Sequence, residues 1–472
     1  MKKLLAFLLL FKLSIVQATG DPIKATINCT LHGFKKEANP NWLPGGIILY
    51  KIKNGAAVKL DVQRPDADGN FSYTVDVKEG IYFLAKPSKS EAFKHVLYLK
   101  AGEQKKVDFY NEYDSCVVDQ PNVETNSLQS WTKAFNSHVA AARRKPADSY
   151  RQYDELVKFA SSFLKSGKTT NTYFNNWLAD KIDTDLKYFR AANFFRFGRL
   201  NATYDSSAAV QSFYKPLNDK KIINDPRLLR SEHGMALLNY TFAYWKLMEG
   251  STTDQLVANL FSPENAVEIS NSSVKIAFLL YKMPGINKYE DFVQHVQPNK
   301  DLFITKEQKD AYQKRYEELY LFAKGTPGYD FKLKDANDKT YTLSSFKGKV
   351  VVIDIWAMWC GPCLAEKPVM EKIAEGYHNR NDIVFVGIST DGLSKKEVWK
   401  AFLKKKNFTS VELLSNYTES IYQYYKIEGI PRFMVFDRQG KIVNVDAPKP
   451  SEPAFKTLLE QTLKTEERVT NN

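Results

Sequence analysis

Val350–Cys363 reads VVVIDIWAMWCGPC. The run Lys349–Trp356 is almost continuously apolar, which is typical of a strand in the centre of a sheet that is covered on both faces. A helical pattern follows over Leu364–Tyr377. The stretch therefore predicts a buried strand followed by a helix, with Cys360 and Cys363 at the point where the helix begins.

This position suits two cysteines for dithiol–disulfide chemistry. A cysteine at a helix N-terminus faces unpaired backbone N–H groups and the positive end of the helix dipole, which favour the thiolate. Cys363 follows Cys360 by three residues and lies on the same helical face, within reach for a disulfide. We expect Cys360 to be the exposed attacking thiolate and Cys363 the more buried resolving thiol.

Zinc binding is the alternative for a single CxxC pair. The other two cysteines, Cys29 and Cys116, form no second CxxC, and the six histidines show no ligand spacing. Because a structural zinc site needs four such ligands, no metal is predicted.

Strands and helices alternate around this stretch. A second apolar strand is expected at Ile383–Ser389, and Arg432–Asp437 and Lys441–Asp446 read as an antiparallel hairpin. Further helical patterns cover Lys395–Lys406 and Pro453–Leu463. This order predicts a mixed sheet with helices on both faces, in an α/β domain of residues 326–472.

The CxxC stretch and three flanking motifs together carry a family resemblance: Thr342–Lys349 (TLSSFKGK), Glu366-Lys367-Pro368 and Gly429-Ile430-Pro431. With these motifs the domain resembles the thioredoxin superfamily, and more narrowly the TlpA/ResA-type thiol–disulfide oxidoreductases of bacterial envelopes. The resemblance implies a thioredoxin-like fold and a redox-active disulfide between Cys360 and Cys363.

Asp354 matches the buried carboxylate that lies below the thiols in thioredoxins. A desolvated acid there has a raised pKa and could relay a proton to or from Cys363. The alternative is that Asp354 is only hydrogen-bonded in the sheet. Many TlpA/ResA-type proteins carry an amide at this position, so Asp354 departs toward ordinary thioredoxin.

The resemblance also implies a client-binding surface. Pro431 matches the family's cis-proline beside the cysteine pair, and its nitrogen has no N–H to compete for a docking peptide. The residues implied for client binding are Trp359, Gly361, Pro362, Ile430 and Pro431. Arg432 stands where relatives often carry Thr, so we expect a different partner preference.

The N-terminus predicts export. Lys2 and Lys3 precede the apolar run Leu4–Phe11, and Val16-Gln17-Ala18 offers small residues at a cleavage site. We predict a signal peptide at residues 1–18 and a soluble protein of the periplasm or cell envelope; an uncleaved N-terminal anchor is the alternative.

Two further domains are predicted between these ends. Residues 19–120 alternate in hydrophobicity between turn signals, which indicates an antiparallel β-sandwich. Residues 121–325 change to a helical period and predict an all-α domain. Cys29 and Cys116 lie near the ends of the sandwich, where a structural disulfide and two buried free thiols are equally compatible with the sequence.

Composition narrows the function classes. The 472 residues are 43% hydrophobic, which excludes a wholly disordered chain. The net charge of +13 is spread along the sequence, and no nucleic-acid module is present, so nucleic acid is not an expected partner.

These observations predict an exported enzyme of cell redox homeostasis, a protein-disulfide oxidoreductase that reduces disulfides of other envelope proteins through Cys360 and Cys363. Its partners would be client proteins and a membrane-linked thiol electron donor, with no organic cofactor; a homo-oligomer is left open. The alternatives are a disulfide oxidase or isomerase, and a binding or scaffold protein with an accessory redox domain.

Overall fold

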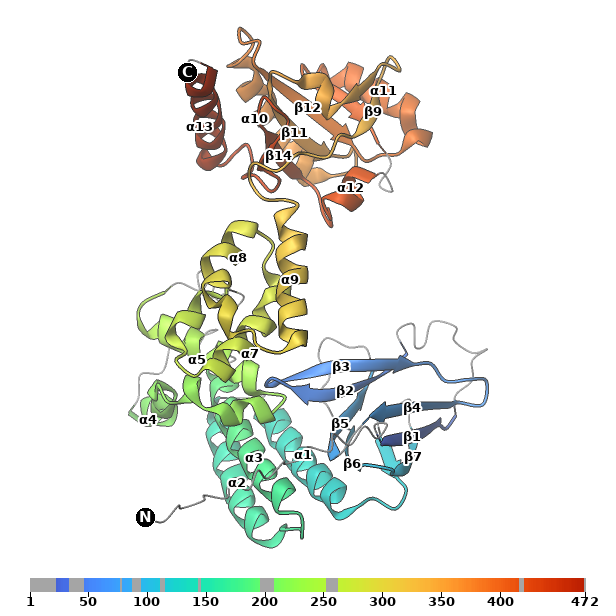
Figure 1. Ribbon diagram of the computed structural model, residues 1–472, viewed down its shortest axis with the longest axis vertical. Coiled ribbons are helices and arrows are strands. Elements are labelled where there is room, and N and C mark those ends of the chain that lie inside the picture. Colours follow the sequence, from blue (N-terminus) through green and yellow to red (C-terminus); the bar gives the residue numbers. More distant parts are fainter. Residues whose placement is uncertain are drawn as a thin grey trace, which may run out of the picture. The chain divides into compact units, whose positions relative to one another are not determined.

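The structure, a computed structural model, describes residues 23–33, 46–76, 79–86, 95–110, 115–142, 146–195, 208–251, 262–415 and 420–470. The predicted signal peptide lies outside these ranges. The chain forms two compact units, residues 1–282 and 283–472 (Figure 1). Within the described ranges, no helix is long and apolar enough to cross a membrane.

Two four-stranded sheets, ordered β4-β1-β7-β8 and β3-β2-β5-β6, begin the first unit. Their strands are Lys24–Leu31 (β1), Ile47–Lys53 (β2), Ala56–Gln63 (β3), Asn70–Asp76 (β4), Glu79–Ala85 (β5), His95–Lys100 (β6), Gln104–Tyr110 (β7) and Ser115–Val118 (β8). Alternate residues such as Ile27, Tyr73 and Leu97 are buried in one core with residues of both sheets. This confirms the predicted β-sheet region, although β1 and β7 pair in parallel.

The cysteines of this sandwich are free thiols. Cys29 on β1 and Cys116 on β8 lie on either side of β7, which pairs with both strands. Strands that share a neighbour are about 10 Å apart, whereas a disulfide tolerates a Cα separation of about 7 Å at most. The two thiols are therefore not bridged, and burial raises the pKa of Cys116 to about 11.

The predicted helical region is also confirmed. Its α-helices among the described residues of the first unit are Val123–Ala141 (α1), Pro146–Ser166 (α2), Thr172–Asn193 (α3), Ala208–Tyr214 (α4), Gly234–Met248 (α5) and Ser272–Lys282 (α7), and the second unit begins with Tyr289–His295 (α8) and Lys306–Tyr320 (α9). The division between the units follows α7, so α8 and α9 belong with the C-terminal fold. The domain boundaries at residues 120 and 325 stay predictions.

The helices pack directly on one of the two sheets. Phe83 and Tyr98 of the sheet share a buried core with Leu128 and Trp131 of α1 and with Phe174 of α3. A helix whose apolar stripe faces a sheet buries both surfaces at once. The sheet of β3, β2, β5 and β6 therefore contributes to two cores, one shared with the other sheet and one shared with the helices.

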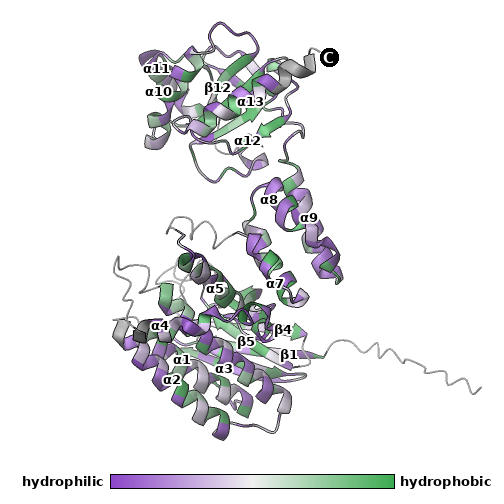
Figure 2. Ribbon diagram, turned by 90° about the vertical axis from the view of Figure 1, so that its left-hand side faces the viewer, coloured by the Kyte–Doolittle hydropathy of each residue, from purple (hydrophilic) through white to green (hydrophobic). Residues whose placement is uncertain are grey.

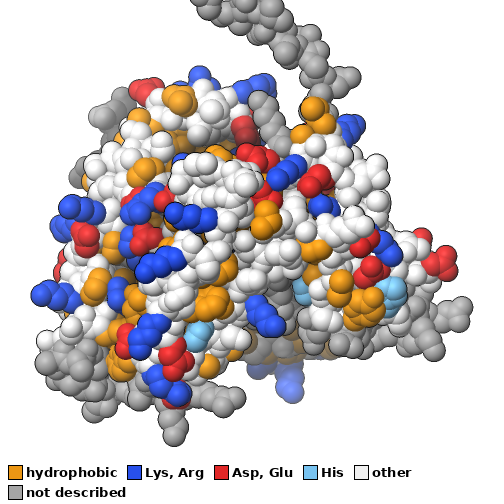
Figure 3. Space-filling view, turned by 90° about the horizontal axis from the view of Figure 1, so that it is seen from below, with side chains coloured by type: hydrophobic (Ala, Val, Ile, Leu, Met, Phe, Trp, Pro, Cys, Tyr) orange, Lys and Arg blue, Asp and Glu red, His pale blue; other side chains and the backbone are white. Residues whose placement is uncertain are grey.

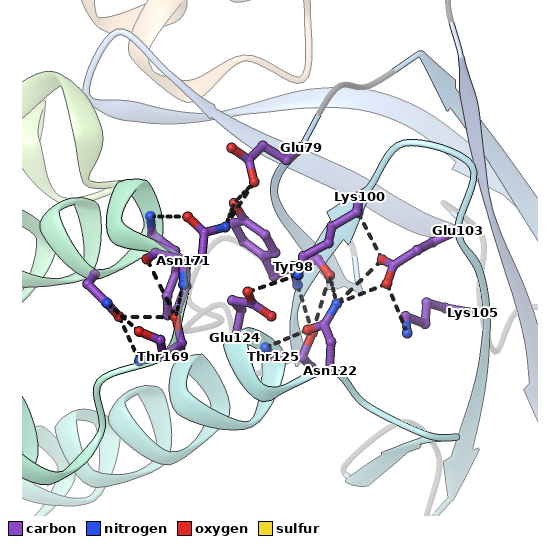
Figure 4. A network of polar contacts seen from close by, with 12 residues as sticks. Glu79, Tyr98, Lys100, Glu103, Lys105, Asn122, Glu124, Thr125, Thr169 and Asn171 are labelled. Atoms are coloured by element: carbon purple, nitrogen blue, oxygen red, sulfur yellow. Dashed lines mark hydrogen bonds and ion pairs between the residues drawn. The ribbon is translucent and has the colours of Figure 1, made fainter.

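Polar groups at this junction fix where α1 and α3 begin (Figure 4). Asn122 accepts a hydrogen bond from the backbone N–H of Thr125 and donates one to the carbonyl of Tyr98. Asn171 caps α3 and donates to Glu79 of β5. Such caps satisfy backbone donors that a helix leaves unpaired, and here they also join the helix ends to the sheet.

The surface carries charges of both signs. On the face seen in Figure 3, Lys and Arg side chains lie among Asp and Glu side chains. Ion pairs in the first unit include Arg230 with Asp180 and Lys187 with Asp183. On this face the net positive charge is therefore not gathered into a single basic patch.

The second unit contains a seven-stranded sheet ordered β10-β9-β13-β12-β11-β14-β15. Its strands are Lys332–Asp335 (β9), Thr340–Thr342 (β10), Val350–Trp356 (β11), Ile383–Ser389 (β12), Val411–Leu414 (β13), Arg432–Phe436 (β14) and Ile442–Asn444 (β15). Strand β11 lies in the interior of this sheet, next to the central strand β12, and is buried along its whole length. It pairs in parallel with β12 and antiparallel with β14, so the apolar run forms a buried interior strand of a mixed sheet.

Helices cover both faces of this sheet, and hydrophobic residues follow its strands (Figure 2). Gly361–Glu375 (α10) and Pro453–Thr470 (α13) pack on one face, where Met370 and Phe455 contact the core. Ser420–Tyr424 (α12) packs on the other face. Lys396–Lys406 (α11) buries Trp399 beside Trp356. The predicted α/β arrangement is confirmed.

Candidate active site

The two cysteines lie where α10 begins, just after the central strand. Cys360 is the N-cap residue of α10, and its sulfur accepts a hydrogen bond from the backbone N–H of Cys363 at 3.2 Å. The two residues are joined by a disulfide, with their Cα atoms 5.3 Å apart. The predicted placement at a helix N-terminus is confirmed, and there the helix dipole stabilises a thiolate on Cys360.

Cys360, the predicted attacking residue, is less exposed than the sequence predicted. Cys360 is 4% exposed and Cys363 1%. Both pack in a small apolar cluster with Trp356, Trp399 and Leu414, which covers the disulfide from the side of the sheet. The predicted order of exposure holds, but the accessible surface belongs mainly to the residues around Cys360.

Those neighbours are the residues predicted to bind clients. Trp359 is 66% exposed, and Gly361 and Pro362 are exposed at the first turn of α10. The Ile430–Pro431 peptide bond is cis, as the resemblance implies. Ile430 packs against the cysteine cluster because β14, which starts directly after Pro431, is the neighbour of β11. The fold therefore brings these five residues to one site.

Arg432, the departure from the family pattern, is the first residue of β14. Its guanidinium lies 2.9 Å from the carboxylate of Asp446, which follows β15. A half-exposed ion pair of this kind contributes little to stability. It does hold the Arg432 guanidinium against Asp446.

Asp354 lies in the middle of β11 and is 4% exposed. Burial raises the pKa of this carboxyl group to about 6, against the opposing effect of the Lys367 ammonium. Oδ2 lies 3.2 Å from Lys367 Nζ, while Oδ1 is buried with no hydrogen-bond partner among the described residues. Asp354 is thus buried as predicted, and its role in proton transfer stays a prediction.

Sequence reasoning missed two charged residues beside Asp354. Lys367 was noticed only as part of the motif after the cysteines, and Glu412 was not noticed at all. Lys367 is 2% exposed, and its Nζ lies 2.6 Å from Glu412 Oε1. The spacing of Cys363 and Lys367, one helical turn apart, was the available signal that both face the sheet.

A second cluster of charged residues lies in the first unit, where its side chains resemble a set of metal ligands. Among the residues described by the structure, one group, Asp185, Glu232 and His233, presents ligand atoms within 4.8 Å of one another. However, Lys181 Nζ lies 2.8 Å from Asp185 and 2.6 Å from Glu232. The ammonium is the cation of this cluster, which is a buried ion-pair network.

Comparisons with known proteins agree with this geometry. Residues 323–460 match the family described as Redoxin. The thioredoxin-like protein YneN of Bacillus subtilis is 31% identical over 121 residues, which are 26% of this chain and 69% of that protein. The thiol-disulfide oxidoreductase ResA of the same organism is 27% identical over 26% of this chain and 66% of its own length.

Among solved structures, this chain is similar to a thiol:disulfide interchange protein of the thioredoxin family from Chlorobium tepidum. It is 24% identical, the match covers 30% of this chain and 98% of that chain, and the TM-score is 0.27. Each of these matches covers less than a third of the present chain. Through its C-terminal part, the chain belongs to the thioredoxin-like thiol–disulfide oxidoreductases.

Proposed function

We propose that this oxidoreductase is exported and reduces disulfides in other proteins of the cell envelope. The observation that carries the proposal is the Cys360–Cys363 disulfide at the N-terminus of α10, with the Cys363 N–H on the Cys360 sulfur. A pair in this position can change between dithiol and disulfide while the sheet and helix stay in place.

The cycle starts from the reduced pair. The Cys360 thiolate attacks one sulfur of a client disulfide, a mixed disulfide forms, and the other client sulfur leaves as a thiolate. Cys363 then gives its proton to the Asp354 carboxylate and attacks the Cys360 sulfur. The second client thiolate leaves, so two electrons pass to the client and the Cys360–Cys363 disulfide is formed. A thiol donor linked to the membrane would restore the dithiol.

The client would bind across the exposed rim of the site. Trp359 is 66% exposed and offers a flat apolar surface to the client. Ile430 is half-buried beside the cysteines, and its backbone can pair with an extended client segment because Pro431 has no N–H of its own. Such pairing recognises backbone rather than sequence, which suits a reductase with several clients.

Export and direction rest on sequence. The pattern of residues 1–18 supports a signal peptide, and the resemblance to TlpA/ResA-type proteins supports the envelope. The Gly361-Pro362 dipeptide is the one found in reducing thioredoxins, which favours reduction over oxidation.

A trapping variant tests the cycle. In Cys363→Ala, the mixed disulfide between Cys360 and a client cannot be resolved, so we expect envelope proteins linked to the full chain that a thiol reductant releases. Cys360→Ala, which lacks the nucleophile, is the matched control and should trap nothing. If both variants give the same set of adducts, or neither gives any, the proposed cycle is wrong.

The reduction potential of the pair tests the direction. Equilibration of the full chain in redox buffers should give a value near or below about −250 mV for a reductase, whereas a value above about −180 mV would indicate an isomerase or oxidase. A pair with no reversible two-electron couple would leave the scaffold alternative.

A further inference from the structure

Asp354, Gly387 and Glu412 form a row across three neighbouring parallel strands. Asp354 on β11 is the register partner of Gly387 on β12, which is in turn the partner of Glu412 on β13. Residues in one row of a parallel sheet point to the same face. A Cβ atom at Gly387 would lie 2.2 Å from Glu412 Oε2. The carboxylate of Glu412 therefore fills the space above the glycine and extends toward Asp354.

Lys367 reaches this row from α10. Its Nζ lies 2.6 Å from Glu412 Oε1 and 3.2 Å from Asp354 Oδ2, and also 4.9 Å from the centre of the Trp356 ring. Lys367 follows Cys363 by four residues, which places both side chains on the same face of the helix. The buried Lys367 ammonium thus lies between the two buried carboxyl groups, one helical turn after Cys363.

The two carboxyl groups differ in their donors. Glu412 accepts hydrogen bonds from Trp356 Nε1 at 2.8 Å, Ser410 Oγ at 2.6 Å and Lys367. Asp354 has only the longer contact to Lys367, and its Oδ1 is buried without a partner in the part of the chain that the structure describes. A carboxylate with three donors is stabilised in its charged form. A proton that enters this cluster therefore binds to Asp354.

Charge balance leads to the same assignment. One ammonium cannot neutralise two carboxylates, and Glu366, the residue before Lys367 in α10, adds a further negative charge near Asp354. An uncompensated charge in a dry site is costly, so the site takes up a proton instead. The closer Lys367 lies to Glu412, the less its ammonium stabilises the charged form of Asp354.

We propose that Lys367 and Glu412 are positioning residues that set the pH range in which Asp354 accepts the proton of Cys363. This rests on the proposed function, in which Asp354 takes that proton during resolution of the mixed disulfide. Glu412 holds the ammonium closer to itself than to Asp354 and so keeps Asp354 protonated to higher pH. Without the Glu412 charge, Lys367 pairs fully with Asp354; without Lys367, Asp354 faces Glu412 alone.

The two substitutions are expected to act in opposite directions. Glu412→Gln removes the competing charge and keeps the shape, so the midpoint of Asp354 titration should move down by about one pH unit. Lys367→Met removes the ammonium and should move it up by about one unit. The double variant K367M/E412Q removes both the ammonium and the competing carboxylate, so its midpoint should fall between those of wild type and K367M.

Two readouts follow the midpoint in the full chain. With the reduced protein and 5,5′-dithiobis(2-nitrobenzoate), the first thiolate release reports attack by Cys360 and the second reports resolution by Cys363, so the second phase is measured against pH. Infrared titration of the carboxylic C=O band follows Asp354 in the absence of turnover. Glu375→Gln makes the same chemical change at an exposed position of α10 and should shift neither readout.

Asp354→Asn separates the two hypotheses. If this variant keeps the wild-type midpoint, Asp354 is not the proton acceptor, and the relay and the present proposal both fail while the cysteine cycle stands. If the midpoint is lost in D354N but unchanged in E412Q and in the double variant, the role of Lys367 and Glu412 is refuted and the relay stands. Should K367M fail to fold, E412Q and the double variant, which retain no unpaired partner charge, still decide the question.

Discussion

Asp354 should lower the stability of the C-terminal unit at neutral pH. Its pKa is about 6 in the folded chain against 3.8 for an ordinary aspartate, because burial disfavours the carboxylate. Between these two values the folded state binds more protons than the unfolded state, so stability falls as the pH rises from about 4 to about 6. Above pH 6 the full cost is present, and below pH 4 it is absent.

The size of this cost follows from the pKa difference. A difference of about two pH units at about 1.4 kcal/mol per unit corresponds to about 3 kcal/mol. Asn has nearly the shape of protonated Asp and no charge. Asp354→Asn should therefore stabilise the unit by about 3 kcal/mol at pH 8 and by almost nothing at pH 4.

The assay is urea unfolding of the oxidised full chain at both pH values, in wild type and D354N. Hydrogen exchange of the peptide that contains β11 reports opening of this unit, since β11 is an interior strand of its sheet and is buried along its whole length. A D354N gain that is the same at pH 4 and pH 8 would refute the reasoning, and so would a D354N protein that is less stable than wild type at pH 8.

Two further substitutions test the buried charges. Gly387→Ala places a methyl group 2.2 Å from the Glu412 carboxylate. It should break the contact between Glu412 and Lys367 and lower the free energy of unfolding of the C-terminal unit by about 3–5 kcal/mol. A loss below about 1 kcal/mol in urea unfolding would show that Glu412 can move at no cost. Lys181→Met leaves Asp185 and Glu232 without their shared ammonium and should destabilise the first unit by about 3–5 kcal/mol. Hydrogen exchange of a peptide from α3 measures this loss, and an unchanged exchange rate would contradict the prediction.

The redox fold could be predicted from local sequence because each of its signals is local. An apolar strand, two cysteines at the start of a helix and a Gly-Ile-Pro before the next strand are contiguous patterns. From these patterns Cys360, Cys363 and Pro431 are predicted to lie at one site. The structure confirms the strand, the start of the helix at Cys360 and the cis bond before Pro431.

The charged row could not be predicted in the same way. Glu412 belongs to a four-residue strand, VELL, and nothing local shows that it lies opposite Gly387 or near Lys367. That information is in the register of three strands, which depends on contacts far apart in the chain. The core that one of the two sheets shares with α1 was missed for the same reason, since an apolar helical stripe does not show which surface covers it.

The buried charges are better explained by titration than by stability. A buried ion pair returns little net stability compared with apolar side chains of the same size, and Asp354 costs about 3 kcal/mol at neutral pH by the pKa argument above. Natural chains accept such costs mainly where a function needs them. Lys367 reduces this cost without removing it, because its ammonium lies closer to Glu412 than to Asp354. The arrangement therefore keeps a carboxyl group whose proton can leave and return near neutral pH, in a cluster that Lys367 joins to the helical face of Cys363, the thiol that loses a proton in the proposed cycle.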